Sequence, residues 1–157
     1  MRIEYFQLID RIVDVDIAAR TIRAEATVPQ HNTIFEGHFP GFPILPGVLL
    51  IEAMAQTSGW LVIALTRFQR MPFLAAVKDA KLRTFVAPGQ LLTLTASMAH
   101  EGSGYAVTDA TAKAGDKLVG NAQITFRLAD FPGPEFRGHM DEMARRLDFP
   151  HGVPADG

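Results

Sequence analysis

The sequence contains no cysteine, and only one tryptophan and two tyrosines occur among its 157 residues. Without cysteine there is no disulfide framework, no thiolate nucleophile and no thiolate metal site, a composition that suits the reducing cytoplasm where we expect the protein. Charge of one sign is also lacking, since 15 basic and 17 acidic residues give a net charge of −2. Nothing in this balance attracts the chain to nucleic acid or to an anionic membrane, so we expect no nucleic-acid partner.

Several functional motifs are missing as well. There is no Gly-x-Ser-x-Gly nucleophile motif, no phosphate-binding loop and no dinucleotide fingerprint, and we expect no cofactor. His31, Glu36 and His38 carry the imidazole and carboxylate groups that metals bind, but their spacing matches no strong metal motif, and we expect no metal. The N-terminal residues include Glu4 and Asp10 and no continuous apolar stretch, so no secretory signal is predicted.

Hydrophobic residues make up 48% of the chain and follow two different periods. Apolar and polar residues alternate at 11–17 and 21–28, which predicts two half-buried strands forming a hairpin around residues 18–20. Four more strand-like runs follow later, divided by the turn signals Pro-Gly-Gln, Gly-Ser-Gly and Ala-Gly-Asp, at 73–80, 91–101, 105–114 and 117–128.

Residues 48–66 are apolar on nearly every side, which predicts one long helix wrapped by the rest of the protein. Because Glu52 and Gln56 interrupt it, a buried core helix is favoured over a membrane span. The fold class is therefore α+β, with an antiparallel sheet wrapped around a long central apolar helix. We expect one domain at 1–129 and a C-terminal tail at 130–157, surface-packed or partly disordered, with a polar helix at 139–147.

A candidate site lies where a stiff loop meets this helix. The loop at 29–47 contains four prolines and holds His38 between glycines and prolines. Glu52 is a carboxyl group inside an apolar helix, which makes it a candidate proton donor. Gly47 presents an N–H at the start of the helix, and Gln56 lies one helical turn after Glu52. Simpler alternatives exist for each: a hydrogen-bonded loop histidine, an ordinary Pro-Gly turn, and a glutamine that faces a partner subunit.

The segment Gly-His-Phe-Pro-Gly-Phe-Pro-Ile-Leu-Pro-Gly-Val-Leu-Leu-Ile-Glu-Ala-Met-Ala-Gln, at 37–56, resembles the hot-dog-fold 3-hydroxyacyl-[acyl-carrier-protein] dehydratases of bacterial type II fatty-acid synthesis. Weaker similarity extends over 5–127. The resemblance implies a lyase that reversibly removes water from a (3R)-3-hydroxyacyl thioester to give a trans-2-enoyl thioester. It also implies a homodimer, possibly a trimer of dimers.

The resemblance further assigns roles to individual residues. His38 and Glu52 are the implied catalytic pair, contributed by different chains, while the Gly47 N–H contacts the thioester carbonyl and Gln56 supports the acid. An acyl tunnel is expected to be lined by residues that are otherwise simply core: Trp60, Phe73, Leu74 and Val77. Phe73 stands where several members of the family have a gating tyrosine.

The acyl carrier protein of this pathway is acidic, so Lys81 and Arg83 are candidates for docking it, although both are equally explained as solvated charges. Position 52 holds glutamate rather than aspartate, and in this respect the chain resembles the dehydratase that lacks an accompanying isomerase activity. The segment Ala-His-Glu-Gly-Ser-Gly-Tyr-Ala-Val, at 99–107, prompts a specialised role with very-long acyl chains for lipid A.

Two competing functions stay open. One is a hot-dog thioesterase or an enoyl-CoA hydratase, which would hydrolyse acyl thioesters or prefer the coenzyme to the carrier protein. The other is a noncatalytic subunit that binds acyl chains. The presence of both His38 and Glu52 argues against the second, because a scaffold has no evident need for a carboxyl group in an apolar helix.

Overall fold

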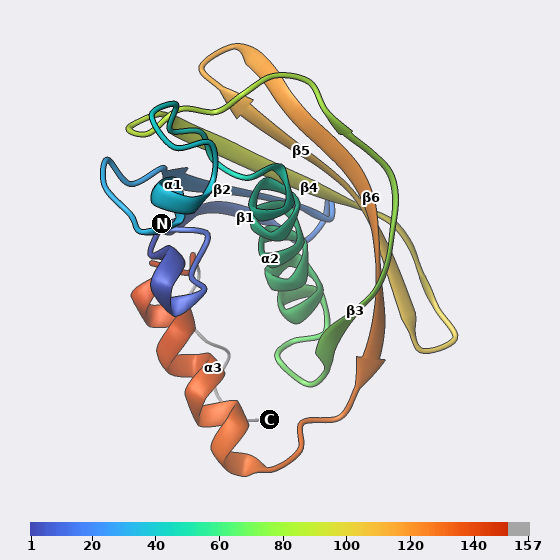
Figure 1. The fold of residues 1–157 in the computed structure, drawn as a ribbon. Helices are drawn as coiled ribbons and strands as arrows, with labels where there is room; N and C mark the ends of the chain where they lie inside the picture. Colours follow the sequence, from blue (N-terminus) through green and yellow to red (C-terminus); the bar gives the residue numbers. More distant parts are fainter. Residues whose placement is uncertain (151–157) are drawn as a thin grey trace.

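The computed structural model describes residues 1–150 and contains one antiparallel six-stranded sheet that curls around a central helix (Figure 1). The strands stand in the order β1-β2-β4-β5-β6-β3. Their bounds are β1 Arg11–Asp16, β2 Thr21–Thr27, β3 Met71–Leu82, β4 Leu91–Gly102, β5 Tyr105–Ala114 and β6 Lys117–Ala129. The helices are the 3₁₀ turn η1 Ile3–Tyr5, α1 Ile34–Gly37, α2 Gly47–Leu65 and α3 Pro134–Arg146. The expected α+β architecture is confirmed.

Most strands bury every second residue, as their alternating sequences predict. β2, β4, β5 and β6 each turn one face towards α2 and leave the other face exposed or half-exposed. The β4–β5 hairpin needs two left-handed residues, Ser103 at φ 53° and Gly104 at φ 79°. The boundaries of the six strands and of α2 lie within two residues of those predicted from the sequence.

The helix α2 forms the centre of the core. Ala53, Met54 and Leu61 on it are fully buried, and its inner surface meets buried residues of the sheet such as Leu94 and Ile124. By length and composition α2 could cross a membrane, but 72% of its most apolar window is buried inside the protein. We therefore describe α2 as a core helix.

The strand β3 departs from the pattern of the other strands. It lies at one edge of the sheet, paired only with β6, and every residue from Phe73 to Leu82 is exposed. Phe73, Leu74 and Val77 are among the large apolar side chains on it that face solvent in the single chain. An edge strand with exposed apolar residues has unpaired backbone groups and an uncovered hydrophobic surface.

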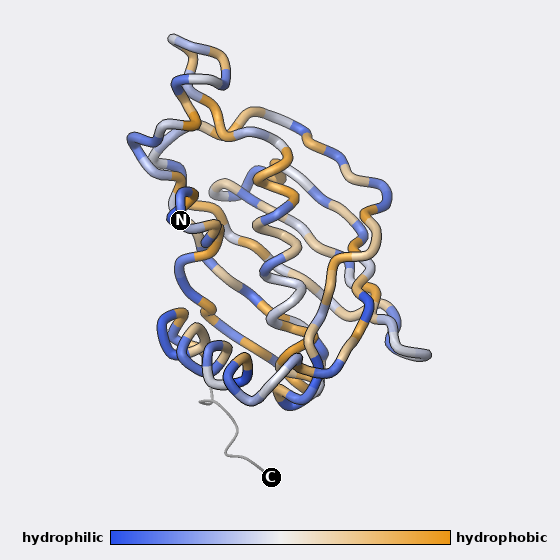
Figure 2. The backbone as a smooth tube through the Cα atoms, turned by 60° about the horizontal axis from the view of Figure 1, so that its bottom comes forward, coloured by the Kyte–Doolittle hydropathy of each residue, from blue (hydrophilic) through white to orange (hydrophobic). Residues whose placement is uncertain are grey.

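The helix α3 follows β6 and begins earlier than the sequence analysis predicts, at Pro134 instead of His139. Proline suits the first helical turn, because the N–H it lacks has no partner there. In Figure 2 the turns of α3 carry both hydrophilic and hydrophobic residues. The apolar ones recur at a spacing of three or four, which gives the helix one apolar stripe: Phe136, Met140, Met143 and Leu147. The final residues of the expected tail, 151–157, lie outside the described residues.

Candidate active site

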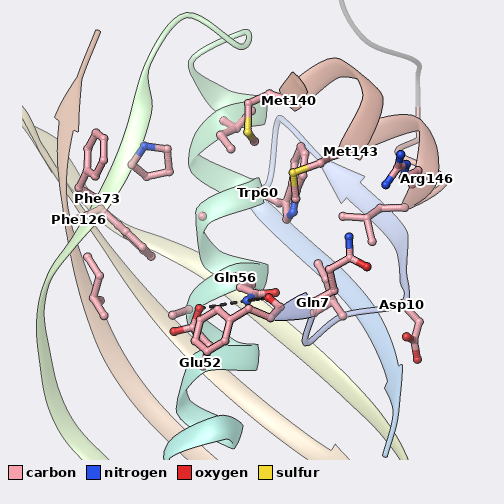
Figure 3. A pocket seen from close by; sticks show the side chains of 18 of the residues that line it. Gln7, Asp10, Glu52, Gln56, Trp60, Phe73, Phe126, Met140, Met143 and Arg146 are labelled. Carbon is pink, nitrogen blue, oxygen red and sulfur yellow. Dashed lines mark hydrogen bonds between the residues drawn. The ribbon is translucent and has the colours of Figure 1, made fainter. Parts of the chain in front are cut away.

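A cavity with a volume of about 600 Å³ lies beside α2. Its walls come from α2, the N-terminal segment, the start of β3, β6 and α3 (Figure 3). Apolar side chains dominate the wall, as in most sites for small molecules. The α2 residues that line it are Glu52, Ala55, Gln56, Gly59, Trp60 and Ile63.

Glu52 is held in this cavity by Gln56. The two lie one helical turn apart, and Gln56 Nε2 donates to Glu52 Oε1 at 3.0 Å (Figure 3). The same Nε2 donates to the Phe6 carbonyl at 2.8 Å, while Gln56 Oε1 accepts from the Leu8 N–H at 3.0 Å. These contacts fix which end of the amide faces the acid. Gln56 therefore orients the carboxyl and also ties the N-terminal segment to α2.

His38 lies at the end of α1, where the chain leaves the helix in an extended conformation. Its Nδ1 is 3.2 Å from the carbonyl oxygen of Ile44, and the Phe39 ring meets the imidazole edge-on with centroids 4.8 Å apart. Because a carbonyl oxygen only accepts, Nδ1 carries the hydrogen in this contact, and Nε2 of the neutral ring keeps its lone pair. Nε2 is therefore the ring nitrogen that is available to accept a proton.

Gly47 is the first residue of α2 and lies in the same cavity as His38, which has a volume of about 450 Å³. The first N–H groups of a helix have no partner within it and point along the positive end of the helix dipole. A Cβ at Gly47 would stand 2.2 Å from Leu82 Cδ1, so the absent side chain keeps this cavity open. Both features suit the binding of a carbonyl oxygen.

The structure divides the sequence-predicted residues between two cavities. Trp60, Phe73 and Leu74 line the larger one with Glu52 and Gln56, whereas Arg83 lines the smaller one with His38 and Gly47. Val77 lines neither cavity, and Lys81 is exposed on β3. Within one chain, His38 and Glu52 therefore lie in different cavities.

Metal-binding groups do not gather within residues 1–150. No three side chains of the histidine, aspartate and glutamate types come together there in a way that would hold a metal ion. His31 and Glu36 line a separate shallow hollow on the loop, away from His38.

The sequence analysis missed one wall of the larger cavity. Met140 and Met143 of α3 line it, and so do Leu147 just after the helix and Gln7 near the N-terminus. The signal for the α3 residues was present in the three-and-four spacing of apolar residues along the tail, within a segment that otherwise looks polar.

An antiparallel sheet wrapped around a central apolar helix defines a hot-dog-fold protein. Similar solved structures include a conserved protein of Pseudomonas aeruginosa, with a TM-score of 0.63 and 23% identity, covering 80% of this chain and 93% of that one. Another is a hypothetical thioesterase of Streptococcus pneumoniae with coenzyme A, with a TM-score of 0.61 and 16% identity, covering 78% and 90%. At these identities the likeness concerns the fold alone.

The sequence comparisons identify the family. The model of the FabA-like domain matches residues 2–123. The 3-hydroxyacyl-[acyl-carrier-protein] dehydratase FabZ of Chlamydia pneumoniae is 38% identical over 128 residues, covering 80% of this chain and 84% of the relative. FabZ of Symbiobacterium thermophilum is 37% identical over 131 residues, covering 83% and 92%. The chain belongs to the FabA-like family.

Proposed function

We propose that this protein catalyses the reversible dehydration of (3R)-3-hydroxyacyl-[acyl-carrier-protein] to trans-2-enoyl-[acyl-carrier-protein] in fatty-acid or lipid A acyl-chain synthesis. The support is the family membership, the FabZ relatives at 34–38% identity, and the presence of a prepared base and an oriented acid beside apolar cavities. In this role it is a lyase that acts in the cytoplasm.

The chemistry follows from the two side chains. His38 Nε2 removes the proton from C2 of the substrate, and the electrons of that C–H bond form the C2–C3 double bond. The C3–O bond breaks as protonated Glu52 gives its proton to the departing hydroxyl, which leaves as water. The Gly47 N–H stabilises the charge that develops on the thioester carbonyl oxygen. Exchange of one proton with solvent restores neutral His38 and protonated Glu52.

A homodimer is supported by the positions of His38 and Glu52, which lie in two different cavities of one chain. A homodimer formed along the β3 edge would cover the apolar surface there and would bring His38 of one chain to the acid of the other. Exposed apolar side chains cluster on β3 and on the segments around the His38 cavity: Phe39, Phe42, Val48, Phe73, Leu74, Val77, Leu82 and Phe85. Such a surface is the kind that subunit contacts cover.

The carrier protein docks, in this account, beside the His38 cavity. Lys81 is exposed, and the Arg83 guanidinium is held by two hydrogen bonds to Asn121 Oδ1, at 2.8 and 3.0 Å, at the cavity wall. Arg83 at the cavity wall and Lys81, two residues before it on the exposed strand, would attract an acidic carrier.

The test is hydration of a crotonyl-carrier-protein thioester, followed as loss of the ultraviolet absorbance of the conjugated enoyl group. We expect turnover by the wild type and loss of turnover by Glu52→Gln, with Glu36→Gln as a matched control because Glu36 is an exposed acid outside both cavities. Release of free acid without hydration would support a thioesterase. Absence of both reactions, for short and long acyl chains, would contradict an enzymatic role.

A further inference from the structure

The helix α3 lies beyond the part of the chain that matches the FabA-like domain, which ends at residue 123. It is nevertheless fixed to the domain at both ends. Near its start, Arg137 Nη1 donates to the Phe68 carbonyl at 2.8 Å. Just after its end, the Leu147 carbonyl accepts from the Ile12 N–H at 2.7 Å. These tethers hold α3 in a defined place against the domain.

An aromatic cluster strengthens the tether after the end of α3. The Phe149 ring packs on Phe68 with centroids 5.3 Å apart and on Trp60 at 6.0 Å. Ala144, in the last turns of the helix, is fully buried. Burial of this kind stabilises the docked position, because each aromatic ring removes a large apolar area from water.

Between its tethers α3 stands apart from α2, and the larger cavity fills the space between them (Figures 1 and 3). Met140 and Met143 line that cavity beside Trp60 of α2. Both methionines are half-buried. A helix that served only to cover the domain would press its apolar stripe onto the core, whereas here two members of the stripe border open space.

The same cavity also contains Glu52, so the α3 wall and the proposed acid share one space. Glu52 and Trp60 are eight residues apart on α2, which corresponds to about 12 Å along the helix axis. A short acyl group that reacts at Glu52 therefore ends well before Trp60 and α3. A long acyl group that runs along α2 from Glu52 would have its far end in this region.

We propose that α3 is the far wall of the acyl pocket, and that Met140 and Met143 are specificity-determining residues for long acyl chains. The inference rests on the proposed function in one respect, that the ligand is an acyl thioester. Methionine suits this position because its unbranched, polarisable side chain adapts to a flexible apolar ligand. In this view residues 1–129 contain the reacting groups, and the segment that follows adds a chain-length limit.

Trp60 gives a test that does not depend on catalysis. It is the only tryptophan in the sequence, it lines the cavity, and it is 5% exposed. The probes are a hexadecanoyl pantetheine thioester with bromine at its last carbon and a butanoyl thioester brominated likewise. We expect the long probe to quench Trp60 fluorescence through heavy-atom contact and the short probe to leave it unchanged. Equal quenching by both probes, or by neither, would overturn the inference.

A second test compares substrates in variants of α3. Met143→Trp places bulk in the cavity, and Arg145→Trp places the same bulk on the exposed side of the helix as a control. We expect Met143→Trp to lower kcat/KM for trans-2-hexadecenoyl-carrier protein by at least about tenfold and to leave kcat/KM for the crotonyl substrate within about twofold. The control should change neither value.

The double variant Met140→Ala/Met143→Ala distinguishes a change in pocket size from a general loss of stability. Its enlarged pocket should shift the preference towards longer or bulkier chains, the opposite direction to Met143→Trp. A parallel loss for both substrates in all α3 variants would show that α3 only stabilises the fold, and would overturn the inference. Quenching by the long probe in a protein without dehydratase activity would overturn the proposed function and leave the pocket assignment standing.

Discussion

The two sides of α2 differ in how completely one chain builds them. On the Glu52 side, the chain supplies a cavity with walls from five segments, and Gln56 holds the carboxyl through a hydrogen bond of 3.0 Å. On the His38 side, the imidazole is fixed by Ile44, but the surrounding apolar side chains remain uncovered. Phe85 and Val48, for example, are each 70% exposed.

The difference indicates what each side requires. The Glu52 side is the more complete of the two, because Gln56 holds the carboxyl and α3 supplies a further wall, while Phe73 and Leu74 at its edge are exposed in the single chain. The His38 side presents a prepared base next to an uncovered hydrophobic surface and an edge strand. A second copy of the chain would complete the His38 side and would supply the acid that this cavity lacks.

The largest effect on activity is expected from replacing either of the two proposed reacting groups, His38 or Glu52. We expect His38→Ala and Glu52→Gln each to lower kcat/KM by about a thousandfold, because general acid and general base contributions are of this order. The double variant should be little worse than either single one, since the two groups act in one step. Enoyl-thioester hydration measures all three, with His139→Ala as a control on the exposed surface of α3.

Next in size is the loss of the partner. Val77→Lys places a charge on the exposed β3 edge, and we expect it to yield a monomer by analytical ultracentrifugation with at least about a hundredfold less activity. Leu91→Lys is the matched control, since Leu91 is 50% exposed at the start of β4 and away from that edge. An active monomer of Val77→Lys would contradict the proposed assembly.

Gln56→Leu tests the contacts on the Glu52 side of α2. The change leaves the Leu8 N–H and the Phe6 carbonyl without their partner and frees the Glu52 carboxyl. We expect the free energy of unfolding to fall by about 1–3 kcal/mol, because each partly buried polar group that loses its partner carries a desolvation cost. Denaturant unfolding measures this loss, and kcat should fall while the subunits stay associated. Gln69→Leu, at an exposed glutamine, should show neither effect.

The smallest effect is expected at the mouth of the His38 cavity. Gly47→Ala forces Leu82 to move, because the new Cβ would lie 2.2 Å from its Cδ1. Leu82 is 49% exposed in the single chain and can move there at little cost, so stability should change by less than about 1 kcal/mol. We expect activity to fall a few-fold from intrusion into the cavity, and Leu82→Ala in the same chain to restore it. No recovery in the double variant would mean that Gly47 acts by another route.

The sequence predicted the fold well because its two periodicities are strong. Alternation at 21–28 and 105–114 and the continuous apolar run from 48 leave few other arrangements for a chain of this length. The weakest prediction concerned the tail. Its apolar stripe is sparse among many charges, and only the tertiary contacts of Phe149 and Arg137 reveal that α3 is docked.

The site could be predicted only in part. His38 and Glu52 stand out in the sequence, because one lies in a stiff loop and the other in an apolar helix. Their distribution between two cavities depends on how α1 and α2 are placed in space, which no local pattern encodes. The same holds for Val77, which the family resemblance places in the tunnel wall, whereas in the single chain it lies on the exposed edge strand and lines neither cavity.

The measurement that tests the central claim most directly is subunit mixing. Homodimers of His38→Ala and of Glu52→Gln, each inactive, are exchanged and assayed for enoyl-thioester hydration, with two different tags to verify that mixed dimers form. If each site takes its base from one chain and its acid from the other, one site in every mixed dimer is intact, and activity should return to about a quarter of the wild-type value. Verified mixed dimers that remain inactive would contradict a site shared between chains.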